Sequence, residues 1–327
     1  MVKLVIDMSG GDNGVSATIG GVKLFLQDYS DVEFVLVGKK EELKEFENNE
    51  RCTIIDAQEI APMECTALEA MRNKETSVYK AVNAVKEFNA DGVVSAGSTG
   101  AFLSLTTLIN KRIEGVSRPA LILPFPTKQD NKYVVFLDVG ASNENSPEEL
   151  YQFAKMGEAY YRVVFNKENP TLYLMSNGTE EGKGSPVTKE AFKLLKDDKN
   201  FKGYIEARAV YEGHADVVAM DGFTGNVFLK GAEGMAKMMS GMIKDAFKSS
   251  FVSKIGYLFA RKGFKGLSNK MDYKKVGGAL LLGVNTIPVK AHGNSDPNSF
   301  YCSIRVCYNL AKGDVVNKIK QSLNGAK

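Results

Sequence analysis

Cysteine and histidine are scarce in this chain of 327 residues. The two histidines are His214 and His292, and the four cysteines form no C-x-x-C pair. The cysteines stand at positions 52, 65, 302 and 307. Because zinc sites need closely spaced cysteine and histidine ligands, we expect no metal site. Reduced, mostly buried thiols are the default for such a chain, which favours a cytoplasmic protein.

Long apolar runs and nucleotide-binding loops are also missing. No uninterrupted apolar stretch approaches the ~20 residues that a helix needs to span a bilayer. The chain runs directly into an apparent strand, Val2 to Ile6, without the layout of a signal peptide. Neither G-x-x-x-x-G-K-[ST] nor G-x-G-x-x-G occurs. The sequence therefore signals no ATP or NAD site, and we expect no cofactor.

The amino-acid composition is that of an ordinary globular protein, with 44% apolar and 25% charged residues. Its net charge of +3 is unevenly distributed. Residues 244–275 hold nine basic and two acidic side chains, a net charge of +7, which leaves −4 for the rest of the chain. This local excess favours an anionic partner for that one segment, and we expect no nucleic acid partner.

Short apolar segments alternate with helical patterns along the whole chain. The expected strands are Val2–Asp7, Glu33–Gly38, Thr53–Ile55, Gly92–Ser95, Ala120–Leu123, Tyr133–Leu137, Thr171–Met175, Gly203–Ile205, Val217–Met220, Gly277–Val284 and Thr286–Lys290. The expected helices are Ser16–Gln27, Lys39–Asn48, Thr66–Arg72, Ser77–Phe88, Ala101–Asn110, Pro147–Phe165 and Val187–Lys196, with further helices at the end of the chain. This alternation predicts an α/β fold, with a mostly parallel sheet covered by helices on both faces. No repeat or long linker marks a boundary, so we predict a single catalytic domain over residues 1–327.

Six of the expected strands end in small, glycine-rich turns. These turns are Ser9–Gly14, Ala96–Gly100, Val139–Asn143, Ser176–Gly184, Gly222–Asn226 and His292–Ser295. In an open parallel sheet, ligands bind in the crevice beyond the carboxyl ends of the strands. One such turn is weak evidence, since α/β folds need glycines between strands and helices anyway. Six turns, several with Asp, Asn or Ser beside the glycines, indicate a binding crevice.

The segment Asp216–Asn226 is the clearest of these units. Val217–Met220 has the pattern of a buried strand, and an apolar, Met-rich helix is expected from about Val227. The turn between them holds Asp221, Gly222, Thr224, Gly225 and Asn226. A strand, a glycine turn and a helix aim free N–H groups and the positive end of the helix dipole into one crevice. Such a crevice suits a phosphate or a developing oxyanion.

Six motifs of this chain resemble those of the bacterial phosphate acyltransferases of phospholipid synthesis, in the same order and at similar spacing. They are Asp7–Asn13, Val94–Ala101, Leu137–Ala141, Glu180–Gly184, Asp221–Asn226 and Gly277–Val284. The resemblance implies an enzyme that converts acyl-acyl carrier protein and inorganic phosphate into acyl phosphate. It also implies a homodimer with an α/β/α sandwich fold, similar to phosphotransacetylases and isocitrate dehydrogenases.

Three motifs depart from the family pattern. The first loop reads Asp-Met-Ser-Gly-Gly-Asp where the family usually has Asp-Ala-Met-Gly-Gly-Asp. Ser98 and Ser142 stand where Asn is more usual, and Ser176-Asn-Gly-Thr replaces Asn-Ile-Gly-Glu. All of these changes keep the glycine turns, so we interpret the chain as a divergent member.

Attack of phosphate on a thioester requires no protein nucleophile and no metal. It requires a held phosphate dianion, a polarised carbonyl oxygen and a stabilised or protonated thiolate. We predict Lys183, between two glycines, as the catalytic cation and Asn226 as a neutral donor. His292 would donate to the oxyanion or protonate the leaving sulfur. The alternatives are a solvated Lys183 that balances Glu180 and Glu181, and a structural cap at His292.

The other predicted binding residues lie in the same loops. Aspartates are awkward phosphate ligands because like charges repel, so we expect them to orient a lysine, cap helices or tie loops. We expect Asp221–Asn226 to form one wall of a crevice that faces Lys183 and the Asp12–Asn13 loop. The predicted substrate-binding residues are Asp12, Asn13, Ser95, Gly97, Ser98, Asp138, Gly140, Gly182, Asp221, Gly222 and Gly225.

Residues 244–275 form a predicted basic, amphipathic surface segment. Four of its apolar residues fall at i, i+4, i+7 and i+8, which places them on one face of a helix. The predicted contact residues are Phe251, Lys254, Ile255, Leu258, Phe259 and Arg261. This face would pack on the sheet or on a second copy, or it would contact anionic lipid or an acidic carrier protein. The resemblance favours peripheral contact with a membrane.

The resemblance, together with these features, implies a cytoplasmic, membrane-peripheral acyltransferase that makes acyl phosphate from acyl carrier protein thioesters for phosphatidic acid synthesis. One alternative is a phosphotransacetylase-like enzyme that uses coenzyme A thioesters. The other is a non-catalytic, membrane-bound scaffold that binds a phosphoryl ligand.

Overall fold

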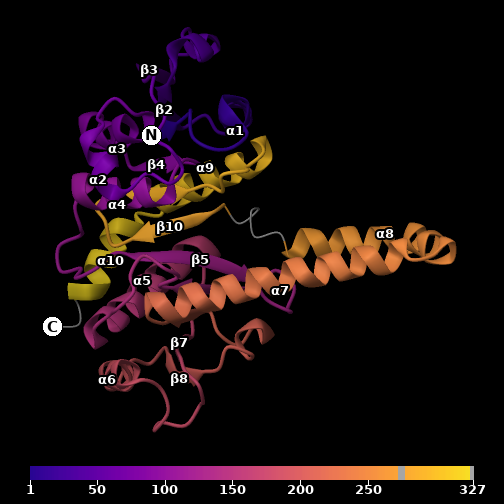
Figure 1. Cartoon of the computed structure of the whole chain (residues 1–327). Helices are drawn as coiled ribbons and strands as arrows, with labels where there is room; N and C mark the ends of the chain where they lie inside the picture. The colour runs from indigo at the N-terminus through magenta and orange to yellow at the C-terminus, as the bar shows by residue number, and fades with distance from the viewer. Residues whose placement is uncertain (272–276, 325–327) are drawn as a thin grey trace.

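The computed structural model describes residues 1–271 and 277–324, and within them eleven strands form one sheet (Figure 1). The order across the sheet is β3-β2-β1-β4-β11-β10-β5-β6-β9-β7-β8. The strands are β1 (Val2–Asp7), β2 (Val32–Gly38), β3 (Cys52–Asp56), β4 (Gly92–Ser95), β5 (Ala120–Pro126), β6 (Tyr133–Leu137), β7 (Leu172–Met175), β8 (Phe201–Ile205), β9 (Val217–Ala219), β10 (Ala279–Leu282) and β11 (Ile287–Lys290). Each lies at or close to an expected strand.

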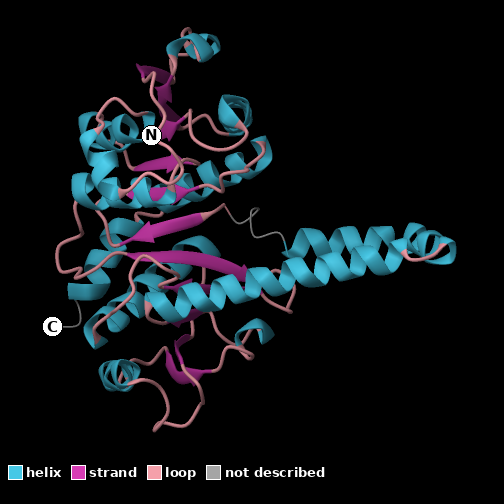
Figure 2. Ribbon diagram, viewed as in Figure 1, coloured by secondary structure: helices cyan, strands magenta, loops and turns pink. Residues whose placement is uncertain are grey.

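Helices cover both faces of this sheet (Figure 2). They are α1 (Gly14–Asp28), α2 (Ala67–Arg72), α3 (Ser77–Glu87), α4 (Thr99–Asn110), α5 (Pro147–Phe165), α6 (Pro186–Leu195), α7 (Gly222–Lys248), α8 (Phe251–Met271), α9 (Pro297–Lys312) and α10 (Val315–Asn324). Three short 3-10 turns are η1 (Lys40–Glu42), η2 (Lys44–Phe46) and η3 (Val210–Glu212). The predicted α/β class and the helices on both faces are confirmed.

The alternation of side chains along β1 explains how two helical layers form. Leu4 and Ile6 are buried in one core cluster with Phe25 of α1, whereas Val5 is buried in a second cluster with Phe102 of α4. Successive residues of a strand point to opposite faces, so an uninterrupted apolar run feeds both layers. The first cluster also contains Leu172 of β7, so it extends over both halves of the sheet.

The sheet consists of two parallel blocks that run in opposite directions. Strands β1, β2, β3, β4 and β11 are parallel to their neighbours in the first block, and β6, β7, β8 and β9 are parallel in the second. Strand β10 is antiparallel to both β11 and β5, so β5 runs in the same direction as the first block. The reversal occurs at the next pair, where β5 is antiparallel to β6. The carboxyl ends of the two blocks therefore lie at opposite edges of the sheet.

The segment Lys39–Asn48 departs from the expected surface helix. It forms the two 3-10 turns η1 and η2. Leu43 and Phe46 are buried, while the charged residues around them are mostly exposed. A 3-10 helix has about three residues per turn, so it places residues that are three apart on one side. This spacing buries both apolar side chains in the core.

Asp216 anchors the amino end of β9 through two lysines. Its carboxylate pairs with Lys132 and with Lys167, the latter at 2.5 Å, and it accepts a hydrogen bond of 2.7 Å from the Thr171 backbone N–H. Burial alone would raise the pKa of Asp216, but the hydrogen bonds from these groups outweigh it and lower the pKa from 3.8 to about 2. The charged form is therefore the one that the fold stabilises.

The stabilising effect of Asp216 is expected to disappear in acid. A carboxylate with a lowered pKa contributes fully above its unfolded value of 3.8, and its contribution is lost as the pH falls through about 2. The difference in unfolding free energy between wild type and Asp216→Asn should thus shrink over this range, as measured by urea denaturation at several pH values. A difference that is constant with pH would contradict this assignment.

Candidate functional site

The glycine turns form two groups, which lie at the two opposite ends of the strands and not at the outermost strands. The loops after β1, β4 and β11 meet at what we call the first edge, and those after β6, β9 and β7 meet at the second edge. The prediction that Asp221–Asn226 and Lys183 share a crevice with the Asp12–Asn13 loop is therefore wrong for a single chain. The sequence predicted a mostly parallel sheet but not where its direction reverses, and the antiparallel pairing of β5 with β6 separates the two sets.

A buried carboxylate lies at the centre of the first edge. Asp7 Oδ2 accepts a hydrogen bond of 2.6 Å from Ser95 Oγ, which in turn accepts one of 3.1 Å from the Gly97 backbone N–H. Burial raises the pKa of Asp7, although hydrogen bonds from Ser95 and Ser77 oppose this rise. Ser95 was expected to donate to a ligand, but its hydroxyl proton is already used by Asp7.

Lys290, which the sequence analysis did not select, joins two loops of the first edge. Its side chain is only 7% exposed, and Nζ donates to the carbonyl oxygens of Ala96, at 3.2 Å, and Ala291, at 2.5 Å. Burial lowers its pKa to about 8, despite the attraction of Asp7 and Asp12. The sequence did contain a sign of this role. Lys290 ends the apolar strand Ile287–Lys290, and charged residues are rare in buried strands.

The remaining loops of the first edge are held together by backbone contacts. The Asp12 N–H donates to the Gly293 carbonyl at 2.7 Å, and Asn13 Nδ2 donates to the Ser295 carbonyl at 2.9 Å. A Cβ on Gly10 would lie 2.5 Å from the Gly97 nitrogen, so these two loops can touch only because Gly10 has no side chain.

Two predicted residues of the first edge differ in their exposure. Ser98 is buried and is the N-cap of α4, where its hydroxyl accepts a hydrogen bond of 3.4 Å from the Ala101 N–H. His292 is exposed, and its Nδ1 accepts one of 3.4 Å from the Asn294 N–H. The imidazole is therefore exposed in the loop that follows β11.

Asp138 ties together the loops of the second edge. Its Oδ1 accepts hydrogen bonds from the backbone N–H groups of Leu121, Gly140 and Ala141, at 2.9 to 3.1 Å. Its Oδ2 accepts from both the N–H and the hydroxyl of Ser142, at 2.9 and 2.7 Å. Of the roles considered for the aspartates, the structure therefore places Asp138 in loop tying.

The helix of the opening motif begins earlier than expected. Asp221 is the N-cap of α7 and accepts hydrogen bonds from the Thr224 N–H, at 2.8 Å, and hydroxyl, at 2.7 Å. The helix starts at Gly222 rather than near Val227. A Cβ on Gly225 would collide with the Asp138 carbonyl. This glycine thus serves close packing of helix on loop, not a turn.

Lys183 and Asn226 are both exposed at the second edge. Asn226 packs beside Gly140, whose φ of +124° favours glycine. The Lys183 loop is closed by a hydrogen bond of 3.0 Å from the Gly184 N–H to Asn177 Oδ1. Gly182 is open to solvent. Within residues 1–271 and 277–324, no carboxylate lies within ion-pair distance of Lys183, so pairing with neighbouring glutamates is not found.

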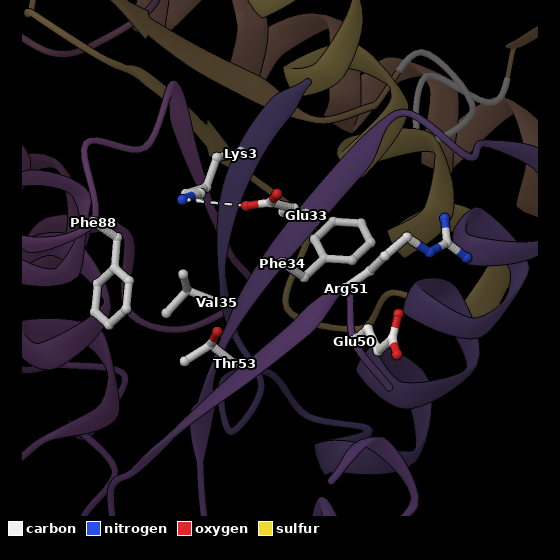
Figure 3. A pocket seen from close by; sticks show the side chains of 8 residues that line it. All are labelled: Lys3, Glu33, Phe34, Val35, Glu50, Arg51, Thr53 and Phe88. Carbon is white, nitrogen blue, oxygen red and sulfur yellow. Dashed lines mark ion pairs between the residues drawn. The ribbon is translucent and has the colours of Figure 1, made fainter. Parts of the chain in front are cut away.

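A small pocket opens near the amino end of β1, away from both groups of loops (Figure 3). Its volume is about 40 Å³, and it is lined in part by Lys3 and Glu33, which form an ion pair of 3.2 Å. This space holds only a few water molecules. A larger cavity of about 390 Å³ lies beside α2.

Helices α7 and α8 form a hairpin that projects from the body of the protein (Figure 1). The rings of Phe247, Tyr257 and Phe264 pack between the two helices at centroid distances of 5.0 to 6.2 Å. At its outer turn is the tip cluster, which consists of the exposed side chains Phe251, Val252, Ile255, Leu258 and Phe259. The predicted helix and its apolar face are confirmed, and this face does not pack on the sheet.

Basic residues accompany the tip cluster. They are Lys244, Lys248, Lys254, Arg261, Lys262 and Lys265. The side chain of Lys270, and the whole of Asp272, Lys274 and Lys275, lie outside the described part of the predicted segment. In the part of the chain that the structure describes, no helix is long and apolar enough to cross a membrane.

A family model and individual relatives both match this chain over nearly its whole length. Residues 2–318 match the model of the family described as "Fatty acid synthesis protein". The chain is 42% identical over 329 residues to a phosphate acyltransferase of Clostridium novyi, covering 98% of both chains. It is 40% identical over 326 residues to a phosphate acyltransferase of Staphylococcus aureus, covering 99% of this chain and 98% of that one.

Two solved structures share the fold. A phosphotransacetylase from Streptococcus pyogenes superposes with a TM-score of 0.62 at 19% identity, covering 95% of this chain and 94% of that one. An isocitrate dehydrogenase from Methylococcus capsulatus gives a TM-score of 0.50 at 10% identity, covering 97% and 88%. The expected similarity to these two folds is confirmed.

Proposed function

The chain belongs to the fatty acid synthesis protein family of phosphate acyltransferases, and we propose that its acyl donor is the thioester of an acyl carrier protein. As a member of this family it is an acyltransferase that transfers an acyl group to phosphate. The acyl phosphate formed would supply phosphatidic acid synthesis. The observation that carries the acyl transfer to phosphate is the full-length match to relatives named phosphate acyltransferase, and the description of the family as a fatty acid synthesis protein supports the proposed carrier-protein donor.

The loop geometry supports specific roles in this reaction. An oxygen of phosphate forms a bond to the thioester carbonyl carbon, the C–S bond breaks, and the departing thiolate takes a proton. Lys183 would hold the phosphate dianion through a charge-assisted hydrogen bond, and Asn226 would donate to the same anion. His292 would protonate the leaving sulfur. Phosphate and the acyl donor are the two substrates that this chemistry needs.

The proposed residues lie at opposite edges of one chain, so we propose that the complete site forms between two copies. Lys183 and Asn226 of one copy would meet His292 of its partner. An exposed apolar stripe along α7 supports this pairing, because contiguous exposed apolar surface marks protein contacts. The stripe consists of Phe223, Val227, Met235, Met238, Met239 and Met242. It begins three residues before Asn226, so whatever covers it lies next to the second edge.

Mixed dimers test this arrangement directly. Lys183→Ala and His292→Ala are each expected to inactivate both sites of their homodimers. A purified heterodimer of the two variants should regain about half of the wild-type activity, because one of its two shared sites is intact. Differently tagged copies that both carry Lys183→Ala are the control and should stay inactive. An inactive mixed heterodimer would place each site within one chain.

A donor series tests the proposed activity itself. Acyl carrier protein and coenzyme A thioesters of several chain lengths are incubated with phosphate, and acyl phosphate is trapped with hydroxylamine. We expect the highest kcat/KM for long-chain carrier protein thioesters. Preference for short coenzyme A thioesters would indicate a phosphotransacetylase-like enzyme, and no trapped product from any donor would indicate the non-catalytic scaffold.

The tip cluster supports a proposal of peripheral membrane contact. Leu258 is 67% exposed and Phe259 is 88% exposed, and Lys254 and Arg261 flank them. An apolar patch rimmed by lysine and arginine fits the interface of an anionic bilayer. Such contact would bring the enzyme to the membrane in which its acyl product is used.

A further inference from the structure

The cavity of about 390 Å³ beside α2 is lined by none of the predicted binding residues. Its volume falls within the usual range of small-molecule sites, roughly 300–1,000 Å³. The lining includes the apolar residues Ala61, Pro62, Cys65 and Ala70. A cavity of this size has room for part of a substrate. The residues that line it, and its contacts with the first edge, indicate which part would fit.

Three of the four polar residues that line the cavity take part in internal hydrogen bonds. Glu69 Oε2 accepts from the N–H and the hydroxyl of Thr66, both at 2.8 Å, which closes the capping box of α2. Asn73 Nδ2 donates to Glu59 Oε2 at 2.7 Å, and Thr76 Oγ1 donates to the Asn73 carbonyl at 3.1 Å.

These internal bonds define the chemistry that the cavity accepts. The carboxylates of Glu64 and Glu69 also line it, so a phosphate group would be repelled. No cation is part of the lining. The chemistry therefore suits an uncharged, apolar group that is held by shape and burial.

Three contacts connect the cavity to the first edge. The Cys65 carbonyl lies 3.7 Å from the position of a Cβ on Gly100, in the first turn of α4, and Met63 Cε lies 3.5 Å from the same position on Gly293. On the inner side, Thr76 is followed by Ser77, whose side chain hydrogen-bonds to Asp7. These contacts place the cavity next to the first edge, within reach of a chain whose head group is held there.

From this lining and these connections we propose that the cavity beside α2 binds the acyl chain of the thioester donor. The proposal rests on the proposed acyl transfer to phosphate and assigns the chain to one place. The carbonyl carbon lies at the first edge, near His292, and the methylene chain extends between α2 and the loop that carries Met63. Filling the cavity should therefore shorten the preferred chain.

Cys65→Phe tests the assignment, because Cys65 lines the cavity and is only partly buried. The ratio of kcat/KM for a sixteen-carbon donor to that for a four-carbon donor should fall at least tenfold. Leu68→Phe is the matched control, since Leu68 lies on α2, is exposed and does not line the cavity; its ratio should equal that of wild type. An unchanged ratio in a folded Cys65→Phe enzyme would overturn the proposal.

A second measurement uses the wild-type protein and does not depend on catalysis. The rate of alkylation of Cys65 by N-ethylmaleimide is followed by peptide mass mapping. Hexadecanoate should slow it at least fivefold, whereas butanoate at the same concentration should not. Equal rates with and without hexadecanoate would refute the subsite even if Cys65→Phe failed to fold. Protection of Cys65 in a protein that makes no acyl phosphate would uphold the subsite and reject the proposed reaction instead.

Discussion

Replacement of Lys183 or Asn226 by alanine is expected to lower the rate of acyl-phosphate formation at least tenfold. Lys183 is exposed at the second edge, and within the described chain no carboxylate neutralises it. Removal of one well-placed donor to a developing oxyanion typically costs about 10²- to 10³-fold in rate. The loss should be largest in kcat/KM for phosphate, which is measured by hydroxylamine trapping at varied phosphate concentrations.

The loss must come from the site and not from the fold. Both side chains are exposed and take no part in the hydrogen bonds of Asp138 or the cap at Asp221, so circular dichroism and the melting temperature should match wild type. Lys189→Ala removes a neighbouring exposed lysine of α6 and should retain full activity. Wild-type rates in both the Lys183 and the Asn226 variants would reject their assignment.

Leu258→Glu is expected to abolish binding to anionic vesicles. Burial of a leucine side chain contributes roughly 1.5–3 kcal/mol, and a glutamate at this point would also be repelled by anionic lipid. The wild-type protein should sediment with vesicles that contain phosphatidylglycerol, and more weakly as salt increases, because Lys254 and Arg261 also contribute.

A matched surface change separates the tip cluster from general apolar surface. Leu108 on α4 is 58% exposed, and Leu108→Glu should leave vesicle binding unchanged. Equal vesicle binding by the Leu258 and Leu108 variants would contradict the proposed membrane contact. Wild-type vesicle binding that does not change with salt concentration would contradict it as well.

The sequence predicts the elements of this protein well and their directions poorly. Helix α5, Pro147–Phe165, has the bounds that its capping box and amphipathic pattern indicate. The antiparallel pairing of β5 with β6 could not be read in the same way, although only residues 127–132 separate them, because short apolar strands carry no signal for the direction in which they pair. One reversal then moved half of the predicted crevice to the other edge.

The same distinction applies to the candidate site. Asp221 was recognisable because a capping residue and its glycines stand next to each other in the chain. Lys290 was not, because its role depends on Ala96 and Asp7, which approach it only in the folded sheet. Local chemistry is thus visible in sequence, whereas a buried charge is identified by its surroundings.

Helix α7 separates the second edge from the tip cluster by a fixed length. Its 27 residues span about 40 Å at 1.5 Å per residue. The Debye length at physiological ionic strength is only about 8 Å, so the field of the tip lysines is screened before it reaches Asn226. Charges at the tip therefore neither attract phosphate to the site nor alter its ionisation. The two ends of one helix are electrostatically independent. Substitutions at the tip should therefore change how much enzyme binds to membranes without changing its turnover in membrane-free solution.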